Sequence, residues 1–344
     1  MLEGFSTNAV VAKIRSIYGS MLTPDDFREM ISKRSVSEVA EQLSSSKRFA
    51  PAFKDVDPNT VHRGLLERLI AEHNFNTYLR LTSFQGLTDK PFYDFLIKKN
   101  ECAQLINLVN AVENGLTDSF VTAVPGYVLS HSRLDFLRLA KCQSFDELTA
   151  ALKGTQYYKP LKSVARREDG SPDFTDAEVK LRTSYYDRLM KSVKDSFFGS
   201  EEDELVKTIR QETDIINIIN CYRLKAYFGY SPEEIRQTEL PYPYLGRRAV
   251  RAIEEAESPA DMFGLIQRTT YGKYLTGEEE DIETAISRRS LEQMRHTVAK
   301  SNSAPTVLYA FMSICDTEMK NIFRVIEAVR YDVDPALIDR LLVI

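Results

Sequence analysis

Apolar residues recur along most of this chain at the spacing of an amphipathic α-helix. Residues 36–43, VSEVAEQL, place four apolar residues at i, i+3, i+4 and i+7, which lie on one face of a helix. The same spacing recurs over residues 65–70 and 262–266. A broader apolar stripe over 215–222 indicates a helix buried on more than one side. Alternating, strand-like runs are nearly absent, so the pattern predicts an all-α protein.

Serine residues mark several helix starts. A serine followed three residues later by glutamate is a capping box, in which the serine oxygen and the acid each accept an N–H that the helix leaves unpaired. The pattern occurs at Ser35 with Glu38, Ser144 with Glu147, and Ser231 with Glu234. Prolines stand at four predicted first helical positions, Pro24, Pro232, Pro259 and Pro335. These residues mark where helices begin and indicate no catalytic or binding site.

One phrase of sequence occurs three times. It joins a capping serine, an acid, an apolar helical face, a polar break and an aromatic residue. The capping residues are Ser35 and Glu38, Ser144 and Glu147, and Ser258 and Asp261, and the aromatic residues of the second and third copies are Tyr157 and Tyr271. The first copy has Arg48 at that place, with Phe49 beside it. A recurring phrase of this kind indicates an internal repeat.

A second phrase recurs in the same order. The sequences QLINLVN, DIINIIN and EMKNIFR align Asn107, Asn217 and Asn321, and we expect each asparagine inside an otherwise apolar helix. The segments VPGYVL at 124–129 and LPYPYL at 240–245, which we call the first and second joints between repeats, contain prolines. Proline disfavours helix in the preceding residue. The chain is therefore predicted to be one all-helical domain, 1–344, made of three repeats of roughly 1–124, 125–240 and 241–344.

Composition narrows the class of protein. The 344 residues carry a net charge of −5, whereas a general nucleic-acid binder is normally basic. The four cysteines are scattered without a C-x-x-C pair, which favours a reducing compartment. The N-terminus shows no secretory signal, and no apolar run is long enough to cross a bilayer. We expect a protein without a transmembrane segment.

The sequence offers no convincing catalytic, cofactor-binding or metal-binding residues. His62 and His73 could share a helix face, but eleven residues separate them, too many for a shared metal. The sequence YGKYLTG at 271–277 lacks the spacing of a phosphate-binding loop. Acidic runs at 201–204 and 278–281 are expected to begin helices, where negative charge is favourable.

Two stretches could contact a partner. Residues 162–178, KSVARREDGSPDFTDAE, are predicted to form a surface loop between two helices. Arg247, Arg248 and Arg251 are predicted to open a helix after the second joint. The residue types in these two stretches do not by themselves indicate which partner they contact.

The order of these phrases resembles the C subunit of bacterial and archaeal V-type (A-type) ATPases, which is similar to the eukaryotic d subunit. The resemblance runs over essentially the whole chain. It rests on KIRSIYGSML, SVSEVAEQL, the T-x-Y copies at 155–157 and 269–271, DIINIINCYRLKAYFGYSPEEI and EMKNIFRVIEAVRYDVDPALI. The first copy departs from the pattern, because SSSKRF replaces T-x-Y; this points to packing rather than an essential tyrosine.

The resemblance implies an all-helical funnel of three similar units about a pseudo-threefold axis, without an active site or cofactor. Such a protein sits on the cytoplasmic face of the membrane proteolipid ring and receives the lower end of the central stalk. It turns with both as part of the rotor, in rotary ion transport linked to ATP synthesis or hydrolysis. The expected partners are therefore the central-stalk subunits and the ring, with no small-molecule substrate.

Two other classes of protein stay open on the residues alone. An all-helical repeat scaffold for unrelated soluble partners would show the same periodicity and caps. An all-helical enzyme using carboxylates would need buried acids with perturbed pKa values gathered in one cleft, and no such spacing is evident.

Overall fold

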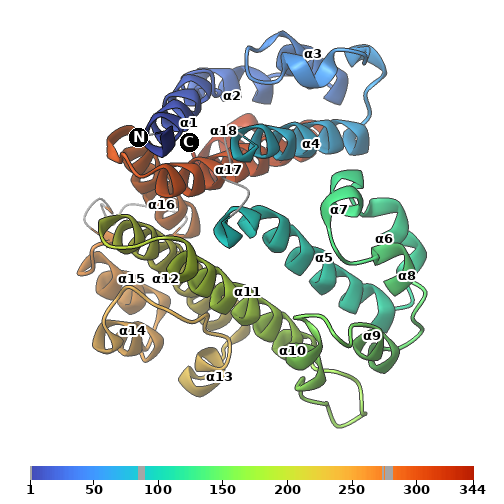
Figure 1. The fold of residues 1–344 in the computed structure, drawn as a ribbon, viewed down its shortest axis with the longest axis vertical. Helices are drawn as coiled ribbons and strands as arrows, with labels where there is room; N and C mark the ends of the chain where they lie inside the picture. Colours follow the sequence, from blue (N-terminus) through green and yellow to red (C-terminus); the bar gives the residue numbers. More distant parts are fainter. Residues whose placement is uncertain (1, 84–89, 273–274, 276–281) are drawn as a thin grey trace. The chain divides into compact units, whose positions relative to one another are not determined.

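The computed structural model describes residues 2–83, 90–272, 275 and 282–344, without the side chains of residues 2–7. Every regular element in these residues is a helix (Figure 1), which confirms the all-α prediction. Lys273 and the acidic run 278–281 lie outside the described residues.

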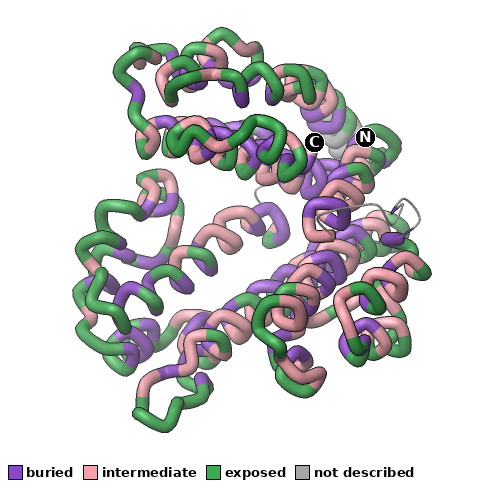
Figure 2. Tube along the Cα trace, turned by 180° about the vertical axis from the view of Figure 1, so that it is seen from behind, coloured by how far each residue is buried: buried purple, intermediate pink, exposed green. Residues whose placement is uncertain are grey.

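Packing divides the chain into two compact units. Unit 1 comprises residues 1–87 and 263–344, and unit 2 comprises residues 88–262. The chain passes between them within α15 (Pro259–Gln267). Unit 1 therefore holds both ends of the chain, and the N and C markers lie close together in both views (Figures 1 and 2).

Unit 1 is built around the long helix α17 (Ala304–Arg330), which packs against six other α-helices of the unit. These are α1 (Leu2–Tyr18), α2 (Pro24–Ile31), α3 (Val36–Ser45), α4 (Arg63–Thr82), α16 (Ile282–Lys300) and α18 (Pro335–Leu341). Two short 3-10 helices, Ala50–Phe53 and Pro58–Thr60, connect α3 to α4. The core joins residues from both ends of the chain, including Met30, Leu43, Ile322 and Leu342.

Unit 2 is built around α5 (Phe95–Glu113) and α11 (Phe174–Ser196), which pack together. The 3-10 helix Pro91–Asp94 precedes α5. The long helix α12 (Ser200–Phe228) packs on α11 and on α14 (Arg247–Glu254). The short helices of the unit are α6 (Thr117–Ala123), α7 (Gly126–His131), α8 (Phe136–Leu139), α9 (Phe145–Ala151), α10 (Tyr158–Lys162) and α13 (Pro232–Arg236).

Burial follows the predicted helical faces. Buried residues recur at helical spacing along α4 and α11, whereas residues 304–312 at the start of α17 are all buried. The run 201–204 lies in the first turn of α12, as predicted. The predicted loop is shorter than expected, since residues 174–178 already belong to α11.

Candidate functional site

The repeated capping phrase has a local geometry of its own. The Ser35 oxygen accepts the Glu38 N–H at 3.2 Å, and Ser144 accepts the Glu147 N–H at the same distance. Complete capping boxes form at Thr23 with Asp26 and at Ser231 with Glu234. At the two repeated phrases the acid instead accepts the N–H of the residue before the serine, Arg34 at 3.0 Å and Gln143 at 2.8 Å. The predicted reciprocal box is therefore wrong at these two sites, whereas the serine caps are confirmed.

The third copy of the phrase forms a related cap. Ser258 accepts the Asp261 N–H at 3.1 Å and donates its hydroxyl hydrogen to the Asp261 carboxylate at 2.6 Å. The Ser231 hydroxyl donates to Glu234 in the same way, at 2.7 Å. All three copies therefore fix the start of their helix with the same serine position.

The hydroxyl of the polar break makes the same two kinds of hydrogen bond in every copy, although the aromatic residue follows it by three positions in the first copy and by two in the others. The hydroxyl donates at 2.7 Å to the carbonyl three residues earlier, in Ser46, Thr155 and Thr269 alike. The same hydroxyl accepts the N–H of the aromatic residue that follows, which is Phe49, Tyr157 or Tyr271. All three rings are buried. Phe49 is therefore the buried aromatic residue of the first copy, and Arg48 has a different role.

Three buried acids accept hydrogen bonds from segments that precede the capped phrases, and we call Glu101, Asp214 and Glu318 the joint acids. Glu101 on α5 accepts the Arg133 N–H at 3.1 Å and the Ser132 hydroxyl at 2.9 Å. Asp214 on α12 accepts the N–H groups of Tyr244 and Leu245 at 2.9 and 2.8 Å. Glu318 on α17 accepts the Leu22 N–H at 2.9 Å. Each acid therefore fixes a segment that enters the next capped phrase.

Tyr157 binds a joint acid in unit 2. Its hydroxyl donates to Glu101 at 2.8 Å, and both side chains are buried. Burial, followed by the Glu101 charge, raises the pKa of Tyr157 well above its usual value, so the phenol stays protonated and remains a donor. Glu101 lies outside the predicted repeat of residues 125–240, so the second phrase packs on the helix that precedes that repeat.

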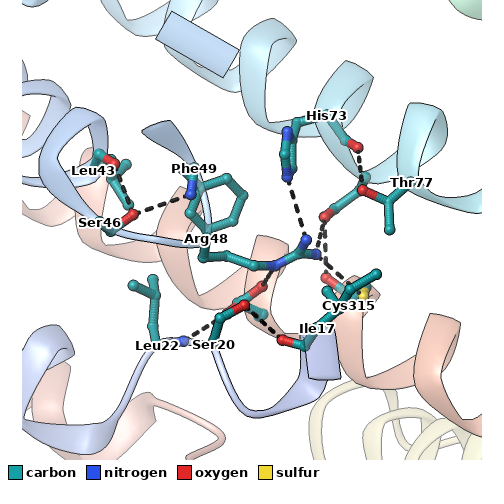
Figure 3. Close-up of polar contacts among 12 residues, drawn as sticks. Ile17, Ser20, Leu22, Leu43, Ser46, Arg48, Phe49, His73, Thr77 and Cys315 are labelled. Atoms are coloured by element: carbon teal, nitrogen blue, oxygen red, sulfur yellow. Dashed lines mark hydrogen bonds and ion pairs between the residues drawn. The ribbon is translucent and has the colours of Figure 1, made fainter. Parts of the chain in front are cut away.

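Arg48 plays the corresponding part in unit 1, where it forms a buried ion pair with Glu318 at 3.1 Å (Figure 3). The guanidinium also donates to Asn74 at 2.6 Å, to His73 at 3.3 Å and to the Cys315 sulfur at 3.3 Å. These bonds occupy all three of its nitrogens, which is what a guanidinium buried away from water requires.

Burial and the Arg48 charge shift the pKa values of the neighbouring side chains. Burial raises the pKa of Glu318, and the Arg48 charge opposes that rise. Burial and then the Arg48 charge lower the pKa of His73 to about 4. His73 is therefore neutral near pH 7 and accepts from Arg48. His62 is the N-cap of α4 and not on its face, so the two histidines do not share the face that we considered.

Two of the aligned asparagines each form a pair of hydrogen bonds with the backbone of one residue far along the sequence, and we call this pair of bonds a clasp. Asn217 donates to the Leu240 carbonyl at 3.0 Å and accepts the Leu240 N–H at 2.8 Å. Asn321 makes the same pair of bonds with Val343, at 2.7 and 3.1 Å. Asn107 is exposed and forms no such clasp. All three asparagines lie within helices, as predicted, but Asn107 is on the exposed side of α5, where Leu105, Ile106, Leu108 and Val109 around it are buried.

Among the described residues, two carboxylates of unit 2 lie together at a small cavity. Glu239 and Glu254 line a cavity of about 20 Å³ in unit 2. Burial and then a hydrogen bond with Glu254 raise the pKa of Glu239 to about 8. That volume holds about one water molecule, so this cavity does not admit a substrate.

The arginines that follow the second joint lie on α14. Arg247, Arg248 and Arg251 are exposed, and among the described residues no carboxylate pairs with them. Across the described ranges we also find no group of three histidine, cysteine or acidic residues placed to hold a metal ion. None of the helices seen there has the length and apolar character needed to cross a membrane.

The joint acids and Arg48 are the residues that sequence reasoning missed. Asp214 and Glu318 are the first residues of DIINIIN and EMKNIFR, so the alignment of asparagines already placed them in register. In the same alignment Glu101 matches Cys315, which lies one helical turn before Glu318. Cys315 also contacts Arg48. The signal was therefore an acid recurring near the asparagine, in helices that otherwise present apolar residues.

Comparison with known proteins identifies the family. The sequence profile of the family described as ATP synthase (C/AC39) subunit matches residues 10–341, so this chain belongs to that family. The C subunit of the A-type ATP synthase from Pyrococcus abyssi is 21% identical over 94% of this chain and 86% of its own length. Its counterpart from Archaeoglobus fulgidus is 24% identical over 68% and 65%. The one from Methanosarcina mazei is 30% identical over 40% and 36%.

Proposed function

We propose that this chain is a non-catalytic rotor component of a V/A-type ATP synthase, which couples the central shaft to the membrane proteolipid ring. Its partners are then the central-stalk subunits and the ring, and its place is the cytoplasmic face of the membrane. Family membership and the names of the relatives support a role in that complex.

One observation carries the mechanical part of the proposal. Glu318 on α17, near the end of the chain, holds Arg48 of the first capped phrase and Leu22, which precedes that phrase. Glu101 on α5 holds Tyr157 of the second capped phrase and Arg133, which precedes that phrase. An acid of the third repeat therefore binds the first repeat, as an acid of the first repeat binds the second. This is the relation expected of three repeats closed about an axis.

Such closure suits a torque coupler. An open row of repeats has two end units with unmet faces, so each end can bend away. A closed arrangement has no end unit, and charge-assisted bonds between buried groups hold each repeat to its neighbour. Torque applied to one repeat is then passed to the others with little internal distortion.

Reconstitution with purified partners tests the proposal. The full chain is immobilised and exposed separately to purified central-stalk subunits and to the detergent-solubilised proteolipid ring. We expect saturable binding to both, and a ternary complex when the two are supplied together. Binding to neither partner would contradict the proposed function.

A further inference from the structure

An unpaired cationic surface on unit 2 points to a specific partner contact. We call Arg247, Arg248 and Arg251 the α14 arginine face. They lie at positions 1, 2 and 5 of α14, which places them on adjoining parts of one helix surface. All three are exposed, and within the part of the chain that the structure describes none forms an ion pair. The nearest acids along the helix, Glu254 and Glu255, are bound by Arg236.

The arginines stand where their charge is unfavourable for the fold. The first turn of a helix carries the positive end of its macrodipole, and cations there destabilise it. Gly246, the N-cap residue, supplies no side-chain acceptor that would offset this effect. Folding alone therefore does not account for the two leading arginines, whereas binding a negatively charged group would satisfy both them and the helix start.

The neighbouring surface has the composition of a protein interface. Lys207 and Arg210 of α12 lie 5.8 and 5.9 Å from the centre of the Tyr244 ring. Tyr242 and Tyr244 are each 37% exposed, and exposed tyrosine beside arginine is typical of protein–protein contact surfaces. The whole chain is negative, at −5, so this cationic surface is a local departure from its average charge.

Rigid supports hold this surface in place. Asp214 accepts the N–H groups of Tyr244 and Leu245, and the Tyr242 hydroxyl donates to Asp187 at 2.7 Å. Tyr242 has a left-handed backbone with φ of 68°, a conformation that is costly for a bulky residue. A surface kept in a costly and well-supported conformation is prepared for contact before the partner arrives.

We propose that the α14 arginine face, together with Tyr242 and Tyr244, docks an acidic protein segment of another member of the complex. The inference rests on the proposed function. The arginines extend over about 6 Å of helix rise, which matches several carboxylates spaced along a helix or strand better than a single phosphate. Guanidinium groups pair with such carboxylates in two-pronged fashion.

A charge-neutralising variant tests the proposal. In R247Q/R248Q/R251Q the helix keeps good helix formers and loses the unfavourable charge, so the thermal midpoint should stay the same or rise. We expect binding to either the central-stalk subunits or the ring to weaken by about tenfold or more, with a shallower salt dependence. The matched control is K141Q/K153Q/K159Q, which removes three exposed charges elsewhere in unit 2 and should bind like the unchanged protein.

Several results would overturn the inference. One is a triple variant that binds both partners as tightly as the unchanged protein. Another is an equal loss in the lysine control. A third is an arginine-dependent binding to phosphatidylglycerol vesicles without any arginine-dependent binding to the two protein partners, which would assign the surface to a membrane. If the unchanged protein binds neither partner, the proposed function itself fails.

Discussion

At the scale of single residues, the two units pair a buried acid with different side chains. In unit 2 Glu101 accepts from the Tyr157 phenol at 2.8 Å and forms an ion pair with Lys98 at 3.0 Å, and in unit 1 the Arg48 guanidinium pairs with Glu318. The Lys98 side chain is 27% exposed, whereas both side chains of the Arg48 pair are buried. Arg48 therefore makes the core of unit 1 depend on an ion pair that neither partner can leave without cost.

Replacing Arg48 with Met should destabilise unit 1 by about 3 to 5 kcal/mol, because Glu318 is left charged or must take up a proton without a partner. The double variant R48M/E318L should lose less than the sum of the single variants, since both charges are gone. Urea unfolding of the four proteins measures the coupling.

The exposed pair of Arg28 with Asp25 is the control for that cycle. Its side chains are 58% and 91% exposed, and R28M should cost at most about 1 kcal/mol. A simple addition of the two single effects at Arg48 and Glu318 would contradict the ion-pair account.

The caps of Ser35 and Ser144 could be predicted because their partners lie three residues away in sequence. Arg48 could not, because Glu318 is 270 residues away along the chain. Local spacing contains no information about that contact. The departure SSSKRF was visible, but its meaning depends on which helix packs over it.

At the scale of elements, asparagine clasps fix chain segments that have no regular structure. Asn217 holds Leu240 in the joint after α13, and Asn321 holds Val343 after α18. A side-chain amide carries both N–H donors and a carbonyl acceptor, so it can satisfy both backbone groups of a single residue. The clasp thus pairs the backbone N–H and C=O groups of an irregular segment, as a neighbouring strand does in a β-sheet.

Asn321→Ala should cost about 2 to 4 kcal/mol, because both polar groups of the buried Val343 backbone lose their partners. Asn217 is only half-buried, so N217A should cost less. The aligned but exposed Asn107 supplies the control, and N107A should change stability by at most about 0.5 kcal/mol. Chemical denaturation ranks the three, and an equal effect in all three variants would refute the clasp.

The contact between α13 and α14 should weaken at alkaline pH. Glu239, which follows α13, has a pKa raised to about 8 and bonds Glu254 at the end of α14. A raised carboxyl pKa means that the folded state holds a proton that the unfolded state releases. Its contribution is therefore complete below about pH 4.5 and is lost as pH rises through about 8.

Glu239→Gln keeps a donor toward Glu254 at every pH, so this variant should lose that pH dependence. Hydrogen exchange of α14 between pH 6 and 9, corrected for intrinsic rates, measures the effect. The exposed Glu257→Gln variant should follow the unchanged protein. An E239Q profile identical to that of the unchanged protein would count against the shared proton.

At the scale of the whole molecule, the chain closes unit 1 with its own two ends. The core of that unit combines Met30 and Leu43 with Ile322 and Leu342. The repeated phrases in the sequence do not indicate which neighbour each phrase packs against. For that reason the predicted limits of the repeats separate Tyr157 from Glu101, and Arg48 from Glu318.

Removing residues 342–344 should loosen helices at the opposite end of the sequence. Leu342 and Val343 are buried, and Val343 is held by Asn321. We expect hydrogen exchange to accelerate in α2 and α3, with the amides of α5 and α11 in unit 2 unchanged. Removal of Ile344 alone should have little effect, because both buried residues remain. Equal acceleration in both units would contradict the division into two units.

The placement of both chain ends in unit 1 also sets an order of events on the ribosome. Residues 1–87 emerge first, but their packing partners in 263–344 emerge only after the roughly 175 residues of unit 2. At about 5 to 20 residues per second, the wait is roughly 10 to 35 s. Unit 2 can fold during that time, while the apolar faces of α2, α3 and α4 stay uncovered. The nascent N-terminal segment is therefore the part of this protein most in need of a chaperone.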